Sequence, residues 1–323
     1  MLKYLYYKFL LKYLYYKFFK INNIIQIIIY TYIYFFSFKG GFTININAEF
    51  HCHSLASDGT LSPKEVIAEA KKSGISLIAL TDHDITSGLD EAKEAAKELD
   101  IQFIPGIELS CEHKGSTIHI LGYFRDDSYK SEDFQKFLNE LKDSRIGRAK
   151  KIVANLEKYF NIKLDYKDVL AKGKGVVARP HIAQCIIDAG YPYDWEYIFD
   201  NFIGNDSPAY VPNKKISVEE GINILKANNA ITVLAHPKLI KRVPVKEVME
   251  FPFDGIEAIY YQNTKKDTDF FISYAVHHDL LITCGSDFHG DHEGDERHGH
   301  VGCMSIPEEY VEKFLKKYNC NKK

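Results

Sequence analysis

The sequence lacks cysteines spaced closely enough to bind a structural zinc ion. Its six cysteines follow an irregular spacing with no C-x-x-C motif: Cys52, Cys111, Cys185, Cys284, Cys303 and Cys320. Zinc fingers need closely spaced cysteine pairs, and disulfide frameworks are typical of much shorter secreted chains. We therefore expect reduced, mostly buried thiols in a cytoplasmic protein.

The sequence also lacks a strong excess of either charge. It has 41 Lys and Arg against 44 Asp and Glu, a net charge of -3. Long duplex nucleic acid is bound through many phosphate contacts, so we expect no duplex partner. Ten prolines and 20 glycines in 323 residues exclude a collagen-like chain, and 46% apolar residues fit a globular protein of about two domains.

Acidic residues are absent from the first 48 positions, which hold six lysines. The octapeptide LKYLYYKF occurs at 2–9 and again at 11–18, and 21–38 carries no charge. We interpret residues 1–42 as a low-complexity extension that results from a mis-called start, with the chain proper beginning near Thr43. There are two alternatives, a membrane anchor and a cleaved signal peptide. Only the anchor would make a membrane a partner of this protein.

From Thr43 the sequence alternates predicted strands and helices. Strands are expected at 44–51, 75–84, 101–110, 117–124, 230–235, 254–259 and 280–284, and helices at 63–73, 88–99, 217–228 and 267–278. Short connections between them predict βα units in a parallel sheet or barrel. Helical spacing with little strand signal predicts a helical insertion at 126–212. The barrel would then occupy 43–125 and 213–309, followed by a tail at 310–323.

Histidines and carboxylates stand at five predicted strand ends. Singly, several have structural explanations: Asp58 suits a D-G turn and His119 a core histidine. Two histidines at i and i+2 on a strand, however, face the same side and can reach one cation. About nine such donors are too many for one tetrahedral zinc and predict two or three cations that share a carboxylate. The candidates are His51, His53, Asp58, His83, Glu108, His119, His236, Asp287 and His289.

Six motifs in this order resemble the PHP (polymerase and histidinol phosphatase) family. They are H-C-H-S-x-x-S-D-G-T from position 51, T-D-H-D from 81, G-I-E from 106, I-H-I-L-G-Y from 118, A-H-P from 235 and G-S-D-F-H from 285. The resemblance covers about 46–305. It implies an α/β fold, a distorted TIM-like (β/α)7 barrel with an inserted helical subdomain, and metal-dependent phosphoester hydrolysis.

The resemblance also implies roles for individual residues. One cation would be held by His51, His53, Glu108 and Asp287, a second by Glu108, His119 and His236, and a third by Asp58, His83 and His289. Mn²⁺ is the expected cation, with Fe or Zn as alternatives. Glu108, His289 and Arg179 would be catalytic, and Arg179, His181 and Lys238 would contact substrate. We expect the loop histidines His292, His298 and His300 to be solvated, with a substrate or adventitious metal contact as the alternative.

R-P-H-I-A at 179–183 resembles one branch of that family, which acts on nucleoside 3′,5′-bisphosphates and on short RNA as a 5′→3′ exoribonuclease. We therefore expect hydrolysis of such nucleotides or short 5′-phosphorylated RNA by metal-activated water, without an obligate protein partner. Basic residues of the insertion would hold a second phosphate or a short backbone; they are Arg145, Arg148, Lys150, Lys151 and Arg179. A histidinol phosphatase and a non-catalytic PHP module are the alternatives.

Overall fold

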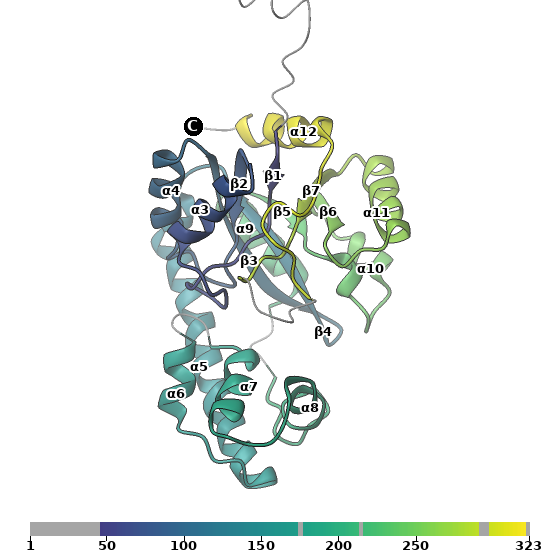
Figure 1. The fold of residues 1–323 in the computed structure, drawn as a ribbon. Coiled ribbons are helices and arrows are strands. Elements are labelled where there is room, and N and C mark those ends of the chain that lie inside the picture. The colour runs from purple at the N-terminus through teal and green to yellow at the C-terminus, as the bar shows by residue number, and fades with distance from the viewer. Residues whose placement is uncertain (1–45, 174–176, 213–215, 291–296, 321–323) are drawn as a thin grey trace, which may run out of the picture. The chain divides into compact units, whose positions relative to one another are not determined.

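The structure is a computed structural model that describes residues 46–173, 177–212, 216–290 and 297–320 (Figure 1). The interpretation of residues 1–42 and the expectation for His292 lie outside the described residues. Within the described ranges, no helix combines the length and the apolar character that crossing a membrane requires.

Seven strands form the barrel and are hydrogen-bonded in chain order. They are β1 (Ala48–Glu49), β2 (Leu77–Leu80), β3 (Gln102–His113), β4 (Ser116–Phe124), β5 (Ala230–Leu234), β6 (Gly255–Tyr260) and β7 (Leu281–Gly285). Just after β1, the Phe50 N–H donates to the Cys284 carbonyl in β7 (3.2 Å), and the His53 N–H donates to the Phe288 carbonyl after β7 (2.8 Å). These bonds bring the ends of the sheet together, and the predicted α/β barrel is confirmed.

Strand β4 departs from the parallel order, since it pairs antiparallel with both β3 and β5. The cause is local. Lys114 and Gly115 connect β3 to β4, and both have positive φ, 48° and 79°. Two such residues favour a tight hairpin, whereas parallel neighbours need a long crossover connection. The start of β4 therefore lies at the edge of the sheet where the parallel strands end.

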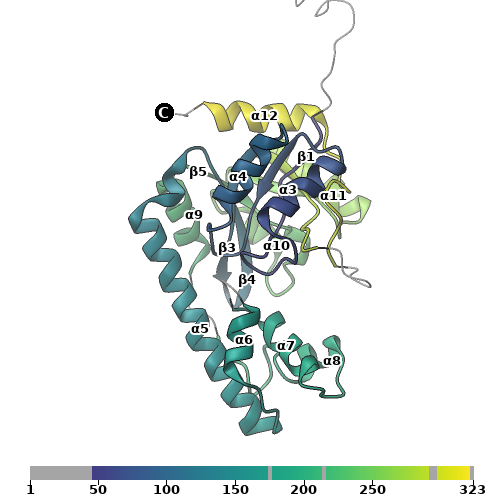
Figure 2. The same cartoon turned by 60° about the vertical axis from the view of Figure 1, so that its left-hand side comes forward.

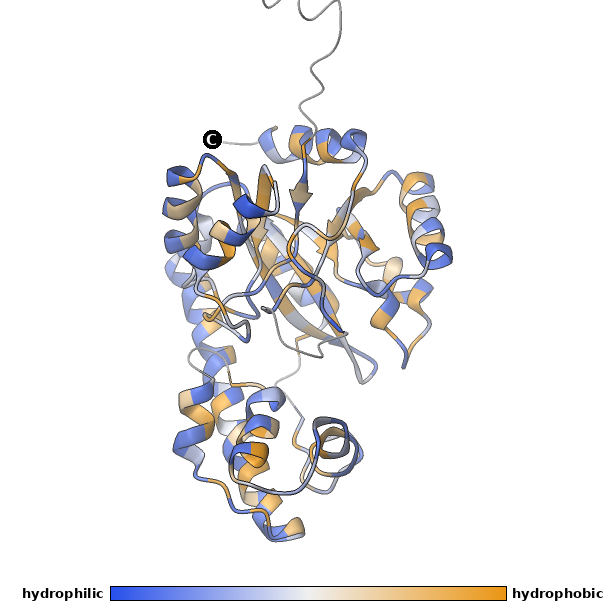
Figure 3. Cartoon of the chain, viewed as in Figure 1, coloured by the Kyte–Doolittle hydropathy of each residue, from blue (hydrophilic) through white to orange (hydrophobic). Residues whose placement is uncertain are grey.

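Helices cover the outside of the barrel (Figures 1 and 3). They are α3 (Pro63–Lys72), α4 (Leu89–Glu98), α9 (Val218–Ala227), α10 (Val245–Met249) and α11 (Lys265–His277), with short 3-10 turns at Asp127–Lys130 and Pro237–Leu239. The start of α3 is set by a capping box between Ser62 and Glu65, as its sequence predicts. Hydrophobic and hydrophilic residues alternate around these helices in Figure 3, so each turns its apolar side to the strands.

The inserted subdomain contains α5 (Glu132–Phe160), α6 (Tyr166–Lys172), α7 (Arg179–Asp188) and α8 (Trp195–Asn201). Its first helix, 29 residues long, runs out of the barrel into the insertion (Figure 2). Phe134 and Leu138 on its first half belong to the barrel core, whereas Ile152 and Leu156 on its second half belong to a separate core within the insertion. One continuous helix therefore holds the insertion on the barrel.

The expected tail at 310–323 is largely a helix, α12 (Glu308–Asn319). Val311, Phe314 and Tyr318 recur at helical spacing and are buried. The Phe314 ring centroid lies 4.7 Å from that of Phe50, and the Tyr318 hydroxyl donates to the Phe124 carbonyl at 2.8 Å. The last helix therefore closes one end of the barrel, because the apolar side chains between β1 and β4 need a cover.

Removing the Phe314 ring should destabilise the barrel. We expect Phe314→Ala to lower the free energy of unfolding by about 3–5 kcal/mol, because a fully buried aromatic side chain leaves a cavity. Urea unfolding followed by circular dichroism measures the change. Phe270→Ala is the matched control, since the Phe270 side chain is 38% exposed and should cost much less. Equal losses for the two variants would contradict the proposed packing of α12.

Candidate metal centre

The nine candidate ligands converge on one edge of the barrel. Five of them, His51, His53, His236, Asp287 and His289, follow β1, β5 or β7, while His83 follows β2 and Asp58 lies in the loop after β1. Glu108 lies within β3, which extends past the end of β2. His119 is near the start of β4, and the reversed direction of that strand brings it to the same edge.

Glu108 stands at the centre of this cluster. Its side chain has no solvent exposure. Its Oε2 lies 3.2 Å from His51 Nε2, 3.1 Å from His53 Nε2 and 3.1 Å from His83 Nδ1. Its Oε1 lies 2.8 Å from His119 Nδ1 and 2.9 Å from His236 Nε2. The two oxygens thus face two sets of histidines, which is the arrangement a carboxylate needs to bridge two cations.

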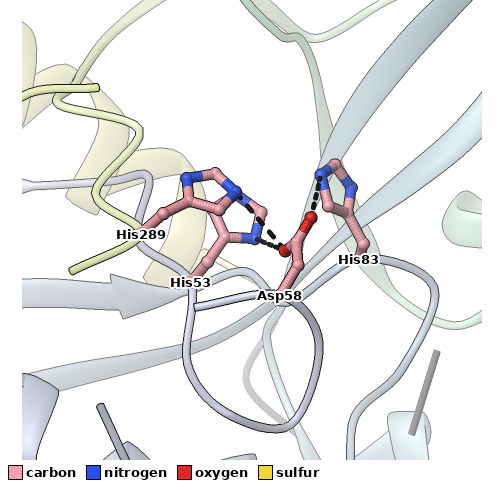
Figure 4. A group of neighbouring side chains, drawn as sticks. All are labelled: His53, Asp58, His83 and His289. Carbon is pink, nitrogen blue, oxygen red and sulfur yellow. Dashed lines mark ion pairs between the residues drawn. The ribbon is translucent and has the colours of Figure 1, made fainter. Parts of the chain in front are cut away.

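Two further carboxylates complete the cluster. Asp287 Oδ1 lies 3.3 Å from His51 Nε2 and 3.2 Å from His53 Nε2. Asp58 faces the opposite nitrogen of His53, with its Oδ1 3.7 Å from His53 Nδ1 and 3.4 Å from His289 Nε2, and its Oδ2 3.8 Å from His83 Nε2 (Figure 4). His53 therefore lies between two groups of donors.

Buried polar atoms without hydrogen bonds mark this cluster as a metal site. They include His53 Nδ1, Asp58 Oδ1, His83 Nδ1, Glu108 Oε2 and His119 Nδ1. An unsatisfied buried polar atom costs free energy, so five in one place need a common partner. Imidazole and carboxylate donors suit divalent transition metals. The donor atoms of His51, His53, Glu108 and Asp287 lie within 4.8 Å of one another, so the cluster is able to bind metal.

Electrostatics favour cations at this site. Burial would raise the pKa of Glu108, yet the neighbouring histidines, His83 and His119 foremost, hold it well below its usual value. For His53, burial is opposed by Asp287 and Glu108, and the pKa rises to about 10. For His83 burial prevails, and the pKa falls to about 4. Glu108 thus stays anionic. Protons compete with metal for His53 but, near neutral pH, not for His83.

The backbone is held in unusual conformations at three residues of the site. Asp84, His236 and Asp287 have positive φ, at 52°, 24° and 54°. Residues other than glycine rarely adopt this left-handed region, and such conformations persist where the surroundings enforce them. His236 and Asp287 belong to the cluster, and Asp84 pairs with Arg145 beside it.

Glu257 is a further member of the site that was not predicted from the sequence. This glutamate lies in β6 and is fully buried. Its Oε1 lies 2.9 Å from His51 Nδ1, and its Oε2 accepts the His236 N–H at 2.7 Å. Tyr260 on the same strand donates its hydroxyl to Asp287 Oδ2 at 3.1 Å. A charged residue within the apolar run G-I-E-A-I-Y was the available signal, because G-I-E also marks Glu108.

A pocket of about 290 Å³ opens beside the cluster. The barrel contributes Asp58, His83 and His119 to its lining, and the insertion contributes Arg145, Arg148, Arg179, Phe199, Asn205 and Tyr210. Arg145 pairs with Asp84 and donates to Ser110 Oγ at 2.9 Å, so α5 is tied to the edge of the barrel. Burial and the nearby Arg179 and Arg145 lower the pKa of Arg148 to about 10. The pocket wall therefore carries concentrated positive charge.

Arg179 is held on this wall by several contacts. Its Nη1 donates to the Ile203 carbonyl at 3.1 Å and to Asn205 Oδ1 at 2.9 Å. Its guanidinium carbon lies 6.0 Å from the Phe199 ring centroid and 5.8 Å from that of Tyr210. Burial lowers the pKa of Arg179 from its usual value, but an arginine remains charged at neutral pH.

Other predicted contacts lie elsewhere. Among the described residues that line the pocket, neither Lys238 nor His181 is found. The Lys238 ammonium pairs with Asp267 at 2.5 Å, and His181 Nδ1 accepts the N–H of the residue before α7 at 3.0 Å. Lys150 lies over the Tyr166 ring, and Lys151 is exposed outside the pocket.

His298 also differs from expectation. We predicted a solvated side chain, but it is partly buried, and its ring centroid lies 4.1 Å from that of His289. His300 is exposed as expected. A loop rich in glycine and charge gives no sequence signal for this packing of His298 against a distant strand end.

The chain is similar to known phosphoesterases over most of its length. Residues 49–198 match the PHP domain family. A 5′-3′ exoribonuclease from Haemophilus influenzae is 33% identical over 248 residues, 75% of this chain and 89% of that protein. A 3′,5′-nucleoside bisphosphate phosphatase from Chromobacterium violaceum is 31% identical over 267 residues, 79% of this chain and 91% of that protein. A structure described as a metal-dependent phosphoesterase from Bifidobacterium adolescentis has a TM-score of 0.72 at 28% identity, covering 84% of this chain and 96% of the other.

Glu257 should set the metal affinity without being a ligand. In Glu257→Gln an NH2 group replaces one carboxylate oxygen and faces either the His236 N–H or the His51 ring. One of the two hydrogen bonds of Glu257 is therefore replaced by a repulsive contact. We expect metal affinity to fall roughly 10- to 100-fold with the fold intact, as measured by calorimetric titration of the metal-free protein with Mn²⁺. Glu247→Gln, on the surface helix α10, is the control. Unchanged affinity in Glu257→Gln would remove this role.

Proposed function

The chain belongs to the PHP domain family, and from this premise we propose that it hydrolyses phosphomonoesters of nucleoside 3′,5′-bisphosphates and shortens 5′-phosphorylated RNA. Its relatives of 33% and 31% identity carry the names of these two activities. The observation that carries the proposal is the pocket, because it joins the metal cluster directly to arginines and aromatic rings of the insertion.

Two to three divalent cations would be held by the nine ligands, with Mn²⁺ expected and Fe or Zn as alternatives. When bound, they supply an activated water and offset phosphate charge. Glu108 would act by holding two of them at a fixed separation, because its oxygens face different histidines. Asp58, His83 and His289 would hold the third.

The insertion would bind the rest of the substrate. Arg148 and Arg179 line the same pocket as Asp58, His83 and His119, and a guanidinium can bind a phosphate through two hydrogen bonds. The rings of Phe199 and Tyr210 are placed to stack on a base or ribose. Arg145 is already paired with Asp84 and would instead keep the insertion over the site. Lys238 and His181 do not line this pocket, so their predicted contacts with substrate would be made outside it.

The same metal cluster could serve a histidinol phosphatase, so the choice between the two substrates has to depend on the pocket. A wall with two arginines and two aromatic rings suits a second phosphate and a base, and these groups are absent from histidinol phosphate. A non-catalytic module is disfavoured by the cluster itself. All nine donors converge, although a binding module would gain nothing from burying them without partners.

A direct comparison of substrates tests the proposed function. We expect phosphate release with Mn²⁺ from adenosine 3′,5′-bisphosphate and nucleotide release from a short 5′-phosphorylated RNA, both faster than phosphate release from histidinol phosphate. Chelator-treated protein is the control and should be inactive until metal is restored. Fast turnover of histidinol phosphate with no reaction of the two nucleotides would overturn the proposal.

Arg179 should affect substrate use but not metal binding. We expect Arg179→Ala to retain its metal content and to lose roughly 10- to 100-fold in kcat/KM on adenosine 3′,5′-bisphosphate, the scale of a lost charge-assisted hydrogen bond. Elemental analysis and steady-state kinetics measure the two effects separately. Lys151→Ala, on the exposed face of α5, is the matched control. Wild-type kinetics in Arg179→Ala would exclude this residue from the substrate site.

A further inference from the structure

Asn205 is a polar residue of the pocket that is neither a proposed ligand nor one of the arginines. It lies in the loop after α8 and lines the pocket together with Arg179. This loop is ordered by Ser207, whose hydroxyl donates to the Phe202 carbonyl at 2.6 Å and whose N–H donates to the Gly204 carbonyl at 3.1 Å. The Asn205 side chain is therefore presented to the pocket from a hydrogen-bonded turn.

The orientation of the Asn205 amide is set by Arg179. Arg179 Nη1 donates to Asn205 Oδ1 at 2.9 Å. A guanidinium can only donate hydrogen bonds, so the oxygen of the amide has to face it and the NH2 group is left to donate elsewhere. Within the described part of the chain, no oxygen accepts a hydrogen bond from this NH2 group. Asn205 therefore offers its N–H bonds to an acceptor that enters the pocket.

The hydrogen bonds of Arg179 also identify the free edge of its guanidinium. Nη1 carries two N–H bonds, and it donates to the Ile203 carbonyl at 3.1 Å and to Asn205 Oδ1. Nε and Nη2 remain, and two neighbouring guanidinium nitrogens can bind one phosphate through parallel hydrogen bonds. Among the described residues, no carboxylate forms an ion pair with Arg179. Its positive charge is therefore available to a ligand in the pocket.

We propose that the Asn205 amide and the Nε and Nη2 atoms of Arg179 together bind the substrate phosphate that is not hydrolysed, so that Asn205 favours a bisphosphate over a monophosphate. The inference rests on the proposed function and adds a specificity-determining residue to it. Cations at the cluster offset the charge of the phosphate under attack, whereas a second phosphate needs donors elsewhere in the pocket. A neutral amide supplies one without adding a further positive charge beside Arg148 and Arg179.

Two substitutions separate this role of Asn205 from simple support of Arg179. Asn205→Asp keeps an oxygen for Arg179 Nη1 but replaces the NH2 group by a second anionic oxygen, which repels phosphate. We expect kcat/KM on adenosine 3′,5′-bisphosphate to fall roughly 100-fold in Asn205→Asp and roughly tenfold in Asn205→Ala. On p-nitrophenyl phosphate, which carries a single phosphate, both losses should be several-fold smaller. Asn201→Asp is the matched control, because it adds the same charge at an exposed position outside the pocket.

Two kinetic results would overturn the role of Asn205 and leave the proposed function standing. Wild-type or faster turnover of the bisphosphate by Asn205→Asp would show that this position supplies only an oxygen for Arg179. Equal losses on both substrates would make Asn205 a support of the whole pocket. A wild-type protein that hydrolyses neither nucleotide would instead refute the proposed function. Calorimetric binding of adenosine 3′,5′-bisphosphate to the Mn²⁺-loaded protein then tests the site alone: weaker binding by Asn205→Asp would support it, and equal affinity would overturn it.

Discussion

A fully buried glutamate surrounded by five imidazoles governs the arrangement of this barrel. Burying the charge of Glu108 is costly unless partners of opposite charge surround it. Those partners come from four different strands, so the strands have to converge there. The same constraint explains Glu257, which would be costly within an apolar strand if it did not bind both the His51 ring and the His236 backbone.

The pocket brings negatively charged side chains of the barrel close to positively charged side chains of the insertion. Carboxylates of the barrel attract cations on one wall, and arginines of the insertion attract anions on the other. Each set would repel itself if it were alone, because like charges at short distance are unfavourable. The ion pair between Arg145 and Asp84 joins the two walls. A substrate that carries phosphate at two places fits this distribution of charge better than one that carries a single phosphate.

Much of the fold and of the cluster could be predicted from the sequence, since both depend on local patterns. Alternating and helical spacing located most strands and helices, and short motifs at strand ends identified the donors that converge. Contacts between segments that are far apart in the sequence could not be predicted from such local patterns. The ion pair of Lys238 with Asp267 and the packing of the His298 ring against His289 are contacts of this kind. Helix α12 was missed because its amphipathic pattern stood at the end of the chain, where a tail was assumed.

Helix α5 limits how the insertion can change during evolution. One continuous helix has residues in both cores. The rotation of its first half about the helix axis therefore fixes the rotation of its second half. Adding or deleting one residue between Leu141 and Arg148 would turn the far half by about 100° relative to the near half. Arg148 would then leave the pocket even though every residue of the site was retained. Length variation among homologous insertions should therefore be tolerated in the loops after α6 and α7 and excluded from the middle of α5.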